Sequence, residues 1–459
     1  MRVIYWFRQD LRLGDNPALY EAVNAGEILP IYILSDYDER ELGSASRWWL
    51  HNSLMSLNNS LGGKLLFLRG NPIDVLLKLA SEMDINALYW NRCYEPHNLR
   101  YDEELRGIFP NCHIFNGGLL WENILKPDGT PYKVFTHFYR KGCLQGGVMP
   151  RKPLPRPANI RFIERKHKTD LDSLDLLPKV KWYRKFGNDW TIGEDGAITR
   201  LNDFLNNKLH NYKLGRDFPA EDFVSKLSPH LHFGEISPNT IWYNAIDGRD
   251  ISERNLDHFL SELGWREFSY NLLYNFPNLK VENLNQKFNK FPWVNNEDLV
   301  KKWQRGETGF PIIDAGMREL WSSGYMHNRV RMIVASFLVK NLMIDWRIGE
   351  KWFWDCLLDA DMANNAASWQ WVAGSGADAA PYFRIFNPIT QSEKFDPNGI
   401  YIRKHLPEIA HLSNQYIYQP WTYSGKIDYP RPIVELAESR EIALNSFKSI
   451  TELSFNNLK

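Results

Sequence analysis

The chain has 459 residues, of which 44% are hydrophobic and 24% are charged. This length predicts two or three domains, and the composition is ordinary for a soluble globular protein. The 55 Lys and Arg residues equal the 55 Asp and Glu residues in number, which excludes steering onto nucleic acid by net charge. Any affinity for DNA must therefore come from a local basic patch and a shaped pocket.

The cysteines are scattered along the chain without a Cys-x-x-Cys spacing, at Cys93, Cys112, Cys143 and Cys356. This pattern predicts a reducing compartment, with no disulfide framework and no zinc or other metal site. The amino-terminal run MRVIYWFRQDLRLGDN becomes charged directly after a short apolar stretch, which is typical of a first strand and not of a signal peptide. No apolar run is long enough to span a membrane, so we expect a cytoplasmic protein.

The first part of the chain alternates strand and helix patterns. Short apolar runs occur at residues 3–7, 28–34, 64–70, 86–92 and 112–117, separated by helical stretches such as PIDVLLKLASEM. This alternation predicts an α/β domain with a doubly wound parallel sheet of about five strands. Asn16 followed by Pro17 predicts a helix start. Because the GxGxxG fingerprint is absent after the first strand, the fold alone assigns no nucleotide to this sheet.

From about residue 128 to residue 189 the sequence is rich in Pro, Gly and basic residues, as in GGVMPRKPLPRPANIRF, and lacks clean periodicity. We interpret this segment as a linker that crosses the surface. Helical patterns then dominate to the end, as in NLDHFLSELGWREFSYNLLYNF. The expected organisation is therefore an α/β domain over 1–127, a linker over 128–189 and an all-helical domain over 190–459.

The segment FVSKLSPHLHFGEISP contains two Ser-Pro pairs, at Ser228 and Ser237. Each pair has the pattern of an N-cap followed by proline at the first helical position. Free backbone N–H groups at such a helix start, together with the hydroxyl of Ser225, are suited to an anion such as a pyrophosphate. The alternative is an ordinary capped helix.

In ELGWREF, the residues Glu262, Trp265 and Arg266 have the spacing of one helical face. A carboxylate, a ring and a guanidinium on one face make a recognition surface for a planar, polar, anionic ligand. The alternative is a surface ion pair between Glu262 and Arg266, which leaves Trp265 unexplained.

The segment GYMHNRVRMIVASFLVK places Asn328, Arg331 and Met332 along one helical stripe, with Arg329 beside it. The apolar second half of this segment belongs in a core, so its polar first turns are expected to open onto a cavity. His327 is interpreted as a capping or surface residue and not as a metal ligand, because nothing pairs with it at ligand spacing.

The segment DADMANNAASWQWVAG, residues 359–374, has the composition of a helix. Asp361, Asn365 and Trp369 then share one stripe, while Trp371 points to the other side. A plain two-sided core helix is the alternative. Across the whole chain there is no nucleophile elbow, no phosphate loop and no metal-ligand cluster, which leaves cofactor chemistry or pure binding.

Several of these segments together resemble the photolyase/cryptochrome family, and most of all the class I cyclobutane pyrimidine dimer photolyases. The motifs are FRQDLRLGDNPAL, SKLSPHLHFGEISP, ELGWREF, TGFPIIDAGMRELWSSGYMHNRVRMIVASFLVK, DWRIGEKWF and NNAASWQWVAGSGADAAPYFRIFNPITQSEKFD. The resemblance runs in order from about residue 1 to about residue 435. It implies an α/β antenna domain followed by an all-α FAD-binding catalytic domain.

The resemblance also implies light-driven repair. Excited, reduced, non-covalent FAD donates an electron to a thymine dimer that has left the duplex, and the dimer then splits. The residues that resemble the flavin-binding set are Tyr212, Ser225, Lys226, Leu227, Ser228, Arg331, Asp359, Asp361 and Asn365. Val224 stands where the family usually has a hydroxyl. Asp359 resembles the acid that pairs with Arg331, and Asn365 the amide that faces flavin N5, which can accept from a protonated N5 or donate to a bare one.

On the substrate side, Glu262 resembles the carboxyl group that bonds the dimer, a role that requires a retained or shared proton. Asn328 and Met332 resemble further dimer contacts, and Trp265 and Trp371 the walls against which the dimer packs. Contacts to the damaged strand are implied for Arg216, Arg266, Arg329, Arg384 and Gln391. An electron route from the surface to the flavin is implied through Trp293, Trp346 and Trp369.

The main alternative is a cryptochrome, a blue-light receptor without repair activity. Asn365 in place of the acid of plant receptors, the complete set of dimer contacts and the absence of a long tail after the family core weigh against it. Repair of the (6-4) photoproduct is disfavoured because MHNRVRM lacks a histidine pair. A flavoprotein that only binds DNA would show no light-dependent loss of dimers.

The partner expected from the resemblance is UV-damaged DNA, with no membrane, no obligate protein partner and a monomeric state. A second, antenna chromophore remains open. The acid and the lysine of folate-binding members are not found, since Asn98 and Val281 occupy the approximate positions. The alternatives are therefore a folate, a deazaflavin, a second flavin or none, with a slight preference against the folate.

Overall fold

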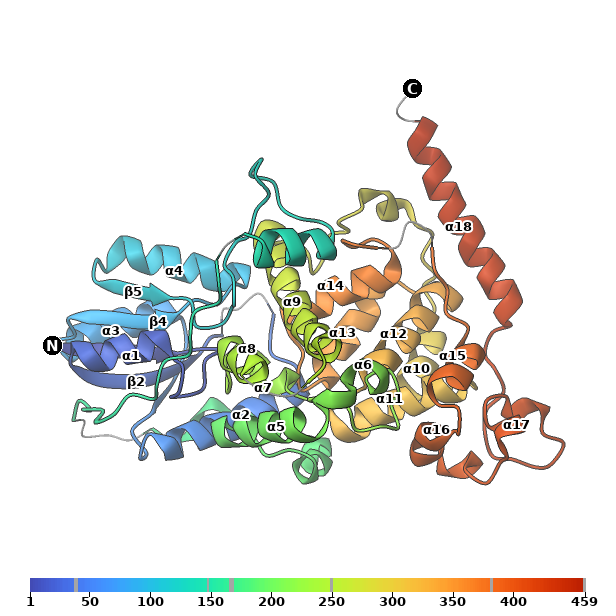
Figure 1. Ribbon diagram of the computed structural model, residues 1–459, viewed down its shortest axis with the longest axis horizontal. Helices are drawn as coiled ribbons and strands as arrows, with labels where there is room; N and C mark the ends of the chain where they lie inside the picture. Colours follow the sequence, from blue (N-terminus) through green and yellow to red (C-terminus); the bar gives the residue numbers. More distant parts are fainter. Residues whose placement is uncertain (37–39, 147, 165–168, 248–250, 380–382, 457–459) are drawn as a thin grey trace.

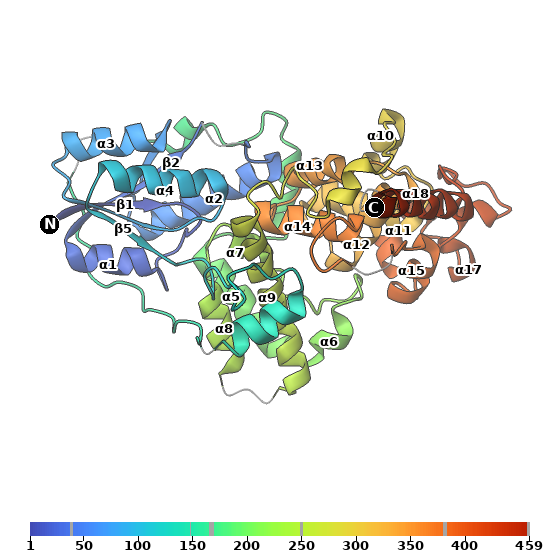
Figure 2. The ribbon, with the colours of Figure 1, turned by 90° about the horizontal axis from the view of Figure 1, so that it is seen from above.

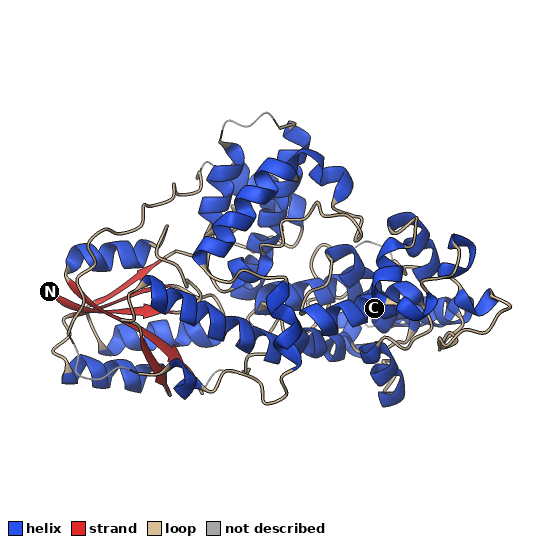
Figure 3. Cartoon of the chain, turned by 90° about the horizontal axis from the view of Figure 1, so that it is seen from below, coloured by secondary structure: helices blue, strands red, loops and turns tan. Residues whose placement is uncertain are grey.

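The computed structural model describes residues 1–36, 40–146, 148–164, 169–247, 251–379 and 383–456. An α/β domain lies at one end of the molecule, and helices form the rest (Figure 1). Figure 3 shows that all the strands belong to that one end. The two-part fold expected from the sequence is confirmed.

The sheet of the α/β domain has five parallel strands in the order β3-β2-β1-β4-β5. The strands are β1 (Arg2–Phe7), β2 (Glu27–Leu34), β3 (Leu66–Arg69), β4 (Ala87–Asn91) and β5 (Cys112–Phe115). The helices between them are α1 (Pro17–Ala25), α2 (Ser44–Ser60), α3 (Pro72–Glu82) and α4 (Pro96–Ile108). Strand order reverses between β1 and β4, so loops diverge there and leave a crevice at the carboxyl ends. That end of the sheet faces the helical domain (Figure 2).

The start of α1 agrees with the prediction. Asn16 is the N-cap, its side chain accepts a hydrogen bond from Leu19 N, and Pro17 is the first helical residue. The amide oxygen therefore satisfies one of the free N–H groups at the helix start.

The segment between the domains is irregular but partly helical. It contains a π-helix at His137–Leu144 and 3₁₀ helices at Leu171–Leu174 and Trp182–Asn188. Near its middle, Ile28 N of β2 donates to Arg161 O, and Ile163 N donates back to Ile28 O. The segment therefore first packs on α9 (Glu253–Asn275), where the Phe135 ring stacks on Trp265, and then returns to the α/β domain before the helical domain begins. The limits 1–127, 128–189 and 190–459 stay predictions, and residues 147 and 165–168 of the expected linker lie outside the described residues.

The helical domain begins with α5 (Glu194–Asn207), and its long central helix is α9 (Glu253–Asn275). The other helices are α6 (Tyr212–Gly215), α7 (Ser228–His232), α8 (Pro238–Ile246), α10 (Glu297–Arg305), α11 (Pro311–Ser323), α12 (Asn328–Ser336), α13 (Trp346–Cys356), α14 (Met362–Ala373), α15 (Pro388–Phe395), α16 (Ile400–His405), α17 (Asn414–Ile417) and α18 (Leu436–Asn456). Helices α9, α12, α13 and α14 contribute to one large apolar core.

The segment FRQDLRLGDN joins the two domains through buried polar contacts. Arg12 is only 2% exposed, and its guanidinium donates to Gly234 O at 2.9 Å, Gly117 O at 2.6 Å and Asp15 O at 2.8 Å. Leu11 N donates to Phe233 O at 3.1 Å. A buried guanidinium with several carbonyl partners is retained only where each donor finds an acceptor. This motif therefore fixes how the α/β domain sits on α7.

The residues that the structure describes include neither a membrane-spanning helix nor a metal-ligand cluster. None of the helices in those ranges is both long and apolar enough to cross a membrane. The same ranges contain no group of three or more His, Cys, Asp or Glu side chains arranged to hold a metal ion.

Candidate functional site

Arg331, Asp359 and Ser228 form a polar cluster between α12, α7 and the loop that precedes α14. Arg331 Nη2 lies 2.9 Å from Asp359 Oδ2, and Arg331 Nε donates to Met326 O at 2.7 Å. Ser228 Oγ donates to the same Asp359 Oδ2 at 2.5 Å. The pairing of Arg331 with Asp359 that the resemblance implied is therefore present.

Ser228 does not have the capping role predicted for it. Helix α7 begins at Ser228, its N-cap is Leu227, and no side chain caps it. Ser228 is already the first residue of the helix, one position after the N-cap, and its hydroxyl donates to the Asp359 carboxylate. The parallel prediction for Ser237 is correct, since its side chain accepts from Thr240 N at the start of α8.

The remaining residues of the expected phosphate-binding run lie beside this cluster in the chain. Lys226 has a backbone φ of 50°, which turns the chain directly before α7. Its ammonium lies 5.9 Å from the ring of Tyr325, over which the guanidinium of Arg331 also lies, at 5.4 Å. Leu227 is buried, and its N–H donates to Ser225 Oγ at 3.4 Å.

Tyr212 lies deep in the core. Its ring packs edge-on against Phe204 and Phe259, and burial raises its pKa. The hydroxyl is therefore neutral and can donate one hydrogen bond.

Asp361 caps α14 and holds a buried negative charge. It accepts from Asn364 N at 2.8 Å and from the Tyr270 hydroxyl at 2.5 Å, and His232 Nδ1 lies 3.5 Å away. Although burial by itself raises the pKa of this carboxyl, the neighbouring His232, Tyr270 and Asn364 N–H lower it to about 2. Asp361 is thus ionised at any physiological pH.

Asn365 has a fixed amide in the next turn of α14. Its Nδ2 donates both to Glu350 O at 3.0 Å and to Glu350 Oε1 at 2.8 Å. Both amide hydrogens are therefore used on α13, and the carbonyl oxygen Oδ1 is the atom left to accept. Glu350 in turn accepts from Arg40 Nη1 at 2.7 Å.

Trp369 packs tightly into the core one turn after Asn365. Its indole meets Phe353 edge-on at 4.9 Å and Trp303 edge-on at 6.2 Å between ring centroids. A Cβ placed on Gly349 would lie 2.2 Å from Trp369 Cη2. Gly349 is therefore required for α13 to approach this ring.

The other two tryptophans of the expected electron route have different neighbours. Trp346 is fully buried, and its Nε1 donates to Asn283 Oδ1 at 2.9 Å. Trp293 is half-buried beside Phe291, at 4.4 Å between ring centroids. Among the described residues, no direct ring contact joins the three tryptophans, so the route stays a prediction.

The expected substrate contacts form a connected set. Arg216, directly after α6, forms an ion pair with Glu262 of α9. Its neighbour Asp217 pairs with Arg329 of α12 at 2.7 Å. Arg329 Nη1 lies 3.8 Å from the sulfur of Met332, and Asn328 Nδ2 lies 4.0 Å from the same sulfur. Residues 216–217 therefore bridge α9 to the polar first turns of α12.

Trp265 and Arg266, which share a helical face with Glu262, make contacts outside the connected set of substrate residues. The ring of Trp265 stacks on Phe135 with centroids 3.8 Å apart. Arg266 Nη1 donates to Gly118 O at 2.8 Å and pairs with Glu267 at 3.0 Å. The surface ion pair of Glu262 with Arg266, considered from the sequence, is therefore wrong.

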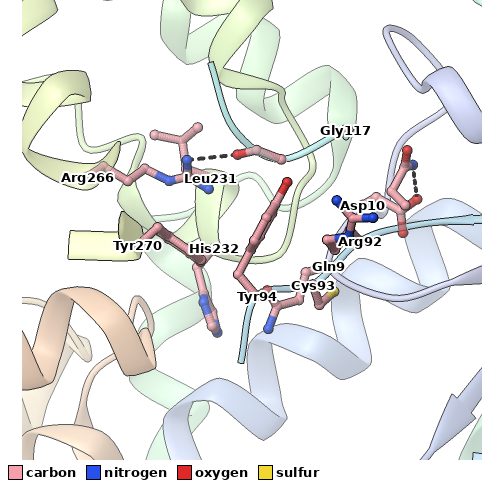
Figure 4. Close-up of a pocket in the computed structure, with 12 residues that line it drawn as sticks. Gln9, Asp10, Arg92, Cys93, Tyr94, Gly117, Leu231, His232, Arg266 and Tyr270 are labelled. Atoms are coloured by element: carbon pink, nitrogen blue, oxygen red, sulfur yellow. Dashed lines mark hydrogen bonds between the residues drawn. The ribbon is translucent and has the colours of Figure 1, made fainter. Parts of the chain in front are cut away.

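Arg266 lines a small cavity at the junction of the two domains. Figure 4 shows it with His232 and Tyr270 of the helical domain, opposite Gln9 and Arg92 of the α/β domain. Its guanidinium is held in the interior by a carbonyl and a carboxylate. This placement does not support the DNA-backbone contact that the resemblance implied for Arg266.

Trp371 and Arg384 border a separate cavity of about 690 Å³. Trp371 Nε1 donates to Asp378 O at 3.1 Å, on the side of α14 away from Glu350. Helix α14 stays regular up to Gly374, which has a φ of 92°. The two tryptophans of α14 therefore point to different surroundings, as their spacing predicted. Gln391 lies in α15.

Three residues of this site were not predicted. Glu350 holds the amide of Asn365, Asp217 holds Arg329, and Trp303 packs against Trp369. Glu350 lies inside the motif DWRIGEKWF, which could have identified it. Asp217 and Trp303 have no comparable local signal, since their partners are distant in sequence.

Comparisons with known proteins agree with this geometry. Residues 3–158 match the DNA photolyase family, and residues 259–449 match the FAD binding domain of DNA photolyase. The deoxyribodipyrimidine photo-lyase of Agrobacterium fabrum is 46% identical over 98% of both chains. Cryptochrome-1 of Arabidopsis thaliana is 34% identical over 95% of this chain and 69% of that protein.

Solved structures give the same result. A bacterial class III photolyase from Agrobacterium tumefaciens, 45% identical, superimposes with a TM-score of 0.94 over 98% of both chains. An archaeal photolyase from Sulfolobus tokodaii, crystallised with two FAD molecules, is 30% identical and has a TM-score of 0.84 over 98% of this chain and all of that one. The chain belongs to the photolyase/cryptochrome family. The subgroup named by the first of these structures is class III, whereas the sequence motifs suggested class I.

Proposed function

We propose that the chain repairs UV-damaged DNA in a light-driven reaction that splits cyclobutane pyrimidine dimers, as a deoxyribodipyrimidine photo-lyase. The observation that carries this proposal is the connected set of Glu262, Arg216, Arg329, Asn328 and Met332 described above. Two helices and one short segment hold an acid, an amide and a thioether beside two guanidinium groups. The 46% identity to a deoxyribodipyrimidine photo-lyase supports the same activity.

The residues present fit FAD, for which the chain has a binding domain. Asp359 Oδ1 is buried and has no hydrogen-bond partner among the described residues, although Oδ2 has two. An orphaned carboxylate oxygen beside a guanidinium is suited to a ligand N–H donor. Reduced FAD bound there supplies, on excitation by light, the electron that the dimer needs.

Three side chains would orient the flavin ring. Arg331 and Asp359 form a half-buried ion pair that presents a donor and an acceptor, and Asn365 presents its fixed carbonyl oxygen. The ring of Tyr212 and the run Ser225, Lys226, Leu227 and Ser228 would hold the rest of the cofactor, with hydroxyl and ammonium groups for its phosphates. Val224 supplies no hydroxyl to this set.

On the substrate side, Glu262 and Arg216 offer a charge-assisted pair that a flipped dimer can enter. Trp265 would pack against one side of the dimer and Trp371 against another. Arg329, Arg384 and Gln391 would contact the damaged strand, chiefly its phosphates. Trp293, Trp346 and Trp369 would return the flavin to its reduced state from the surface.

The α/β domain has a cleft suited to a second chromophore. The cleft measures about 220 Å³ and opens at the carboxyl ends of the strands, where Arg8, Ser35, Arg69 and Glu95 line it. On the other side it reaches Trp354 of the helical domain. Rings with several arginines favour a planar anionic compound. The Sulfolobus tokodaii photolyase carries a second FAD, so we propose an antenna role for this cleft without fixing its occupant.

The cryptochrome alternative has less support, because the identity to cryptochrome-1 is 34% against 46% for the photo-lyase. One experiment separates the two. Reduced, FAD-loaded protein is incubated with a dimer-containing oligonucleotide in blue light or in the dark, and restored thymines are measured. Light-dependent restoration is expected, and its absence would reject the repair function and favour a receptor. Sedimentation of the same protein tests the monomeric state.

A further inference from the structure

Arg40, Glu350 and Asn365 form a continuous hydrogen-bonded chain from the α/β domain into the helical core. Arg40 Nη1 donates to Glu350 Oε1 at 2.7 Å, and the same oxygen accepts from Asn365 Nδ2 at 2.8 Å. Arg40 belongs to the loop between β2 and α2, whereas Glu350 lies on α13 and Asn365 on α14. One carboxylate oxygen therefore joins a residue of one domain to the active-site amide of the other.

The middle of this chain is buried. The side chain of Glu350 is 5% exposed and that of Arg40 is 18% exposed. The Arg40 guanidinium also lies 4.2 Å from the ring centroid of Trp354, one helical turn after Glu350. A carboxylate at such depth is stable as an anion only when a cation and hydrogen-bond donors surround it. Arg40 supplies that cation.

Two acceptors on α13 hold the Asn365 amide, the backbone oxygen of Glu350 and its carboxylate. An ionised carboxylate only accepts, so it takes the amide Nδ2 and leaves Oδ1 for the other side. Without Arg40 the buried carboxylate would lack its cation, and if it turned away towards water it would leave Nδ2 with the backbone oxygen alone. An amide held by one acceptor can turn more readily, and its Oδ1 would no longer be fixed.

We infer that Arg40 is a positioning residue that, through Glu350, keeps the carbonyl oxygen of Asn365 directed at the flavin and thereby favours the reduced flavin. The inference rests on the proposed function, since it places the flavin N5 beside Asn365. A flavin gains a proton at N5 when it is reduced. A fixed acceptor stabilises that protonated form, whereas a fixed donor stabilises the oxidised form.

Arg40 also lines the cleft proposed for the second chromophore. The same guanidinium therefore contacts both the cleft and the carboxylate that orients the amide. The two chromophore sites share one charged group.

The test is the redox equilibrium of FAD in the whole protein. At the midpoint potential of the wild type, the ratio of reduced to oxidised flavin is measured by absorbance in Arg40→Ala, Arg40→Lys and Arg47→Ala. Arg47 is the matched control, because it lines the same cleft but donates to Leu176 O and not to Glu350. We expect a fall of about tenfold in Arg40→Ala, the equivalent of one charge-assisted hydrogen bond. Arg40→Lys should restore most of the ratio, and Arg47→Ala should match the wild type.

A double-variant cycle shows whether Arg40 acts through Glu350. In a Glu350→Gln background the guanidinium has no carboxylate to hold, so adding Arg40→Ala should change the ratio little further. Additive effects, or an unchanged ratio in Arg40→Ala, would overturn the inference. If Arg40→Ala does not retain FAD, Arg40→Gln is compared with Arg40→Lys. Equal flavin ratios in these two variants would also overturn the inference.

Different experimental results would reject the inference about Arg40 and the proposed repair function. Wild-type protein that binds FAD and repairs dimers, with a flavin ratio indifferent to Arg40, would reject only the inference. Wild-type protein that repairs no dimers in light would reject the function itself.

Discussion

Glu262 and Arg216 form an ion pair although they are separated by 46 positions in the chain. The retained or shared proton expected for Glu262 stays a prediction. Glu262→Gln keeps the shape and removes the charge. We expect a lower repair yield per absorbed photon with FAD still bound, measured by restored thymines and flavin absorbance.

The same substitution should change how DNA binding depends on salt. Arg216, freed from its acid, gains a phosphate contact, so the slope of log affinity against log salt should steepen by about 0.9. Glu282→Gln removes an exposed carboxyl group that accepts from Asn278, and it should change neither repair nor the slope. Unaltered repair in Glu262→Gln would remove Glu262 from the substrate site.

Trp293 lies at the outer end of the expected electron route. Trp293→Phe should slow photoreduction of oxidised FAD severalfold, because phenylalanine is harder to oxidise than tryptophan. Repair by chemically pre-reduced protein should continue. Trp321→Phe is the control, since Trp321 is a partly exposed tryptophan that stacks on Trp182 and Trp352. Equal photoreduction rates for wild type and Trp293→Phe would show that electrons enter elsewhere.

Gly349 leaves no room for a side chain against Trp369. Gly349→Ala should lower the free energy of unfolding by about 1–3 kcal/mol through overpacking, despite the better helix propensity of alanine. Gly107→Ala in α4 is the control, because nothing lies within 4 Å of its added Cβ. Urea unfolding of both variants checks this, and a stabilised Gly349→Ala would contradict the close contact.

His327 is a buried N-cap, in agreement with the capping role inferred from the sequence. Its Nδ1 accepts from Arg329 N at the start of α12. Burial lowers its pKa to about 3, below the unfolded value of about 6.5, and nearby arginines act in the same direction. The unfolded chain therefore binds more protons between these values, so stability falls as the pH falls through that window.

The variant His327→Asn keeps a capping oxygen without the titration. Between pH 7 and pH 5 the wild type should lose up to about 2 kcal/mol more unfolding free energy than the variant. The unfolding free energies of both proteins are measured by urea titration at the two pH values. The contributions of all other titratable groups are common to both proteins and cancel in the difference. Parallel losses would show that His327 does not titrate as its surroundings indicate.

Arg12 links the two domains by donating to Gly234 O of the helical domain and to Asp15 O and Gly117 O of its own α/β domain. Arg12→Met keeps much of the volume but leaves those oxygens without a donor, at about 1 kcal/mol or more each. We expect a loss of about 3 kcal/mol in unfolding free energy. Arg156→Met is the control, because that exposed guanidinium has one long hydrogen bond, to Ser60 O at 3.4 Å. A loss below about 1 kcal/mol in Arg12→Met would contradict a structural role.

The fold was predictable because its signals are local. The alternation of apolar runs indicates the sheet, and Asn16, Ser237 and His327 mark helix starts where the structure has them. Ser228 is not a cap, because α7 already begins at that residue, and its hydroxyl donates to Asp359, 131 residues away. No local pattern shows so distant a partner.

The candidate site was predictable in its residue types and less so in its contacts. Spacing placed Glu262 and Arg266 on one face, but burial at the domain junction gives Arg266 to Gly118 and Glu267. The partners of Glu262 and Asn365 come from other helices, and helical periodicity contains no information about them. Those contacts follow only from tertiary packing.

Four residues of helix α13 each make a contact with a different residue elsewhere in the molecule. Trp346 bonds Asn283, Gly349 admits Trp369, Glu350 holds Asn365, and Trp354 supports Arg40. One inserted or deleted residue inside a helix rotates everything beyond it by about 100°. Such a change would break some of these contacts wherever it fell between the first and the last. Length variation among natural relatives should therefore be confined to the loops on either side of α13, even where substitutions within it are tolerated.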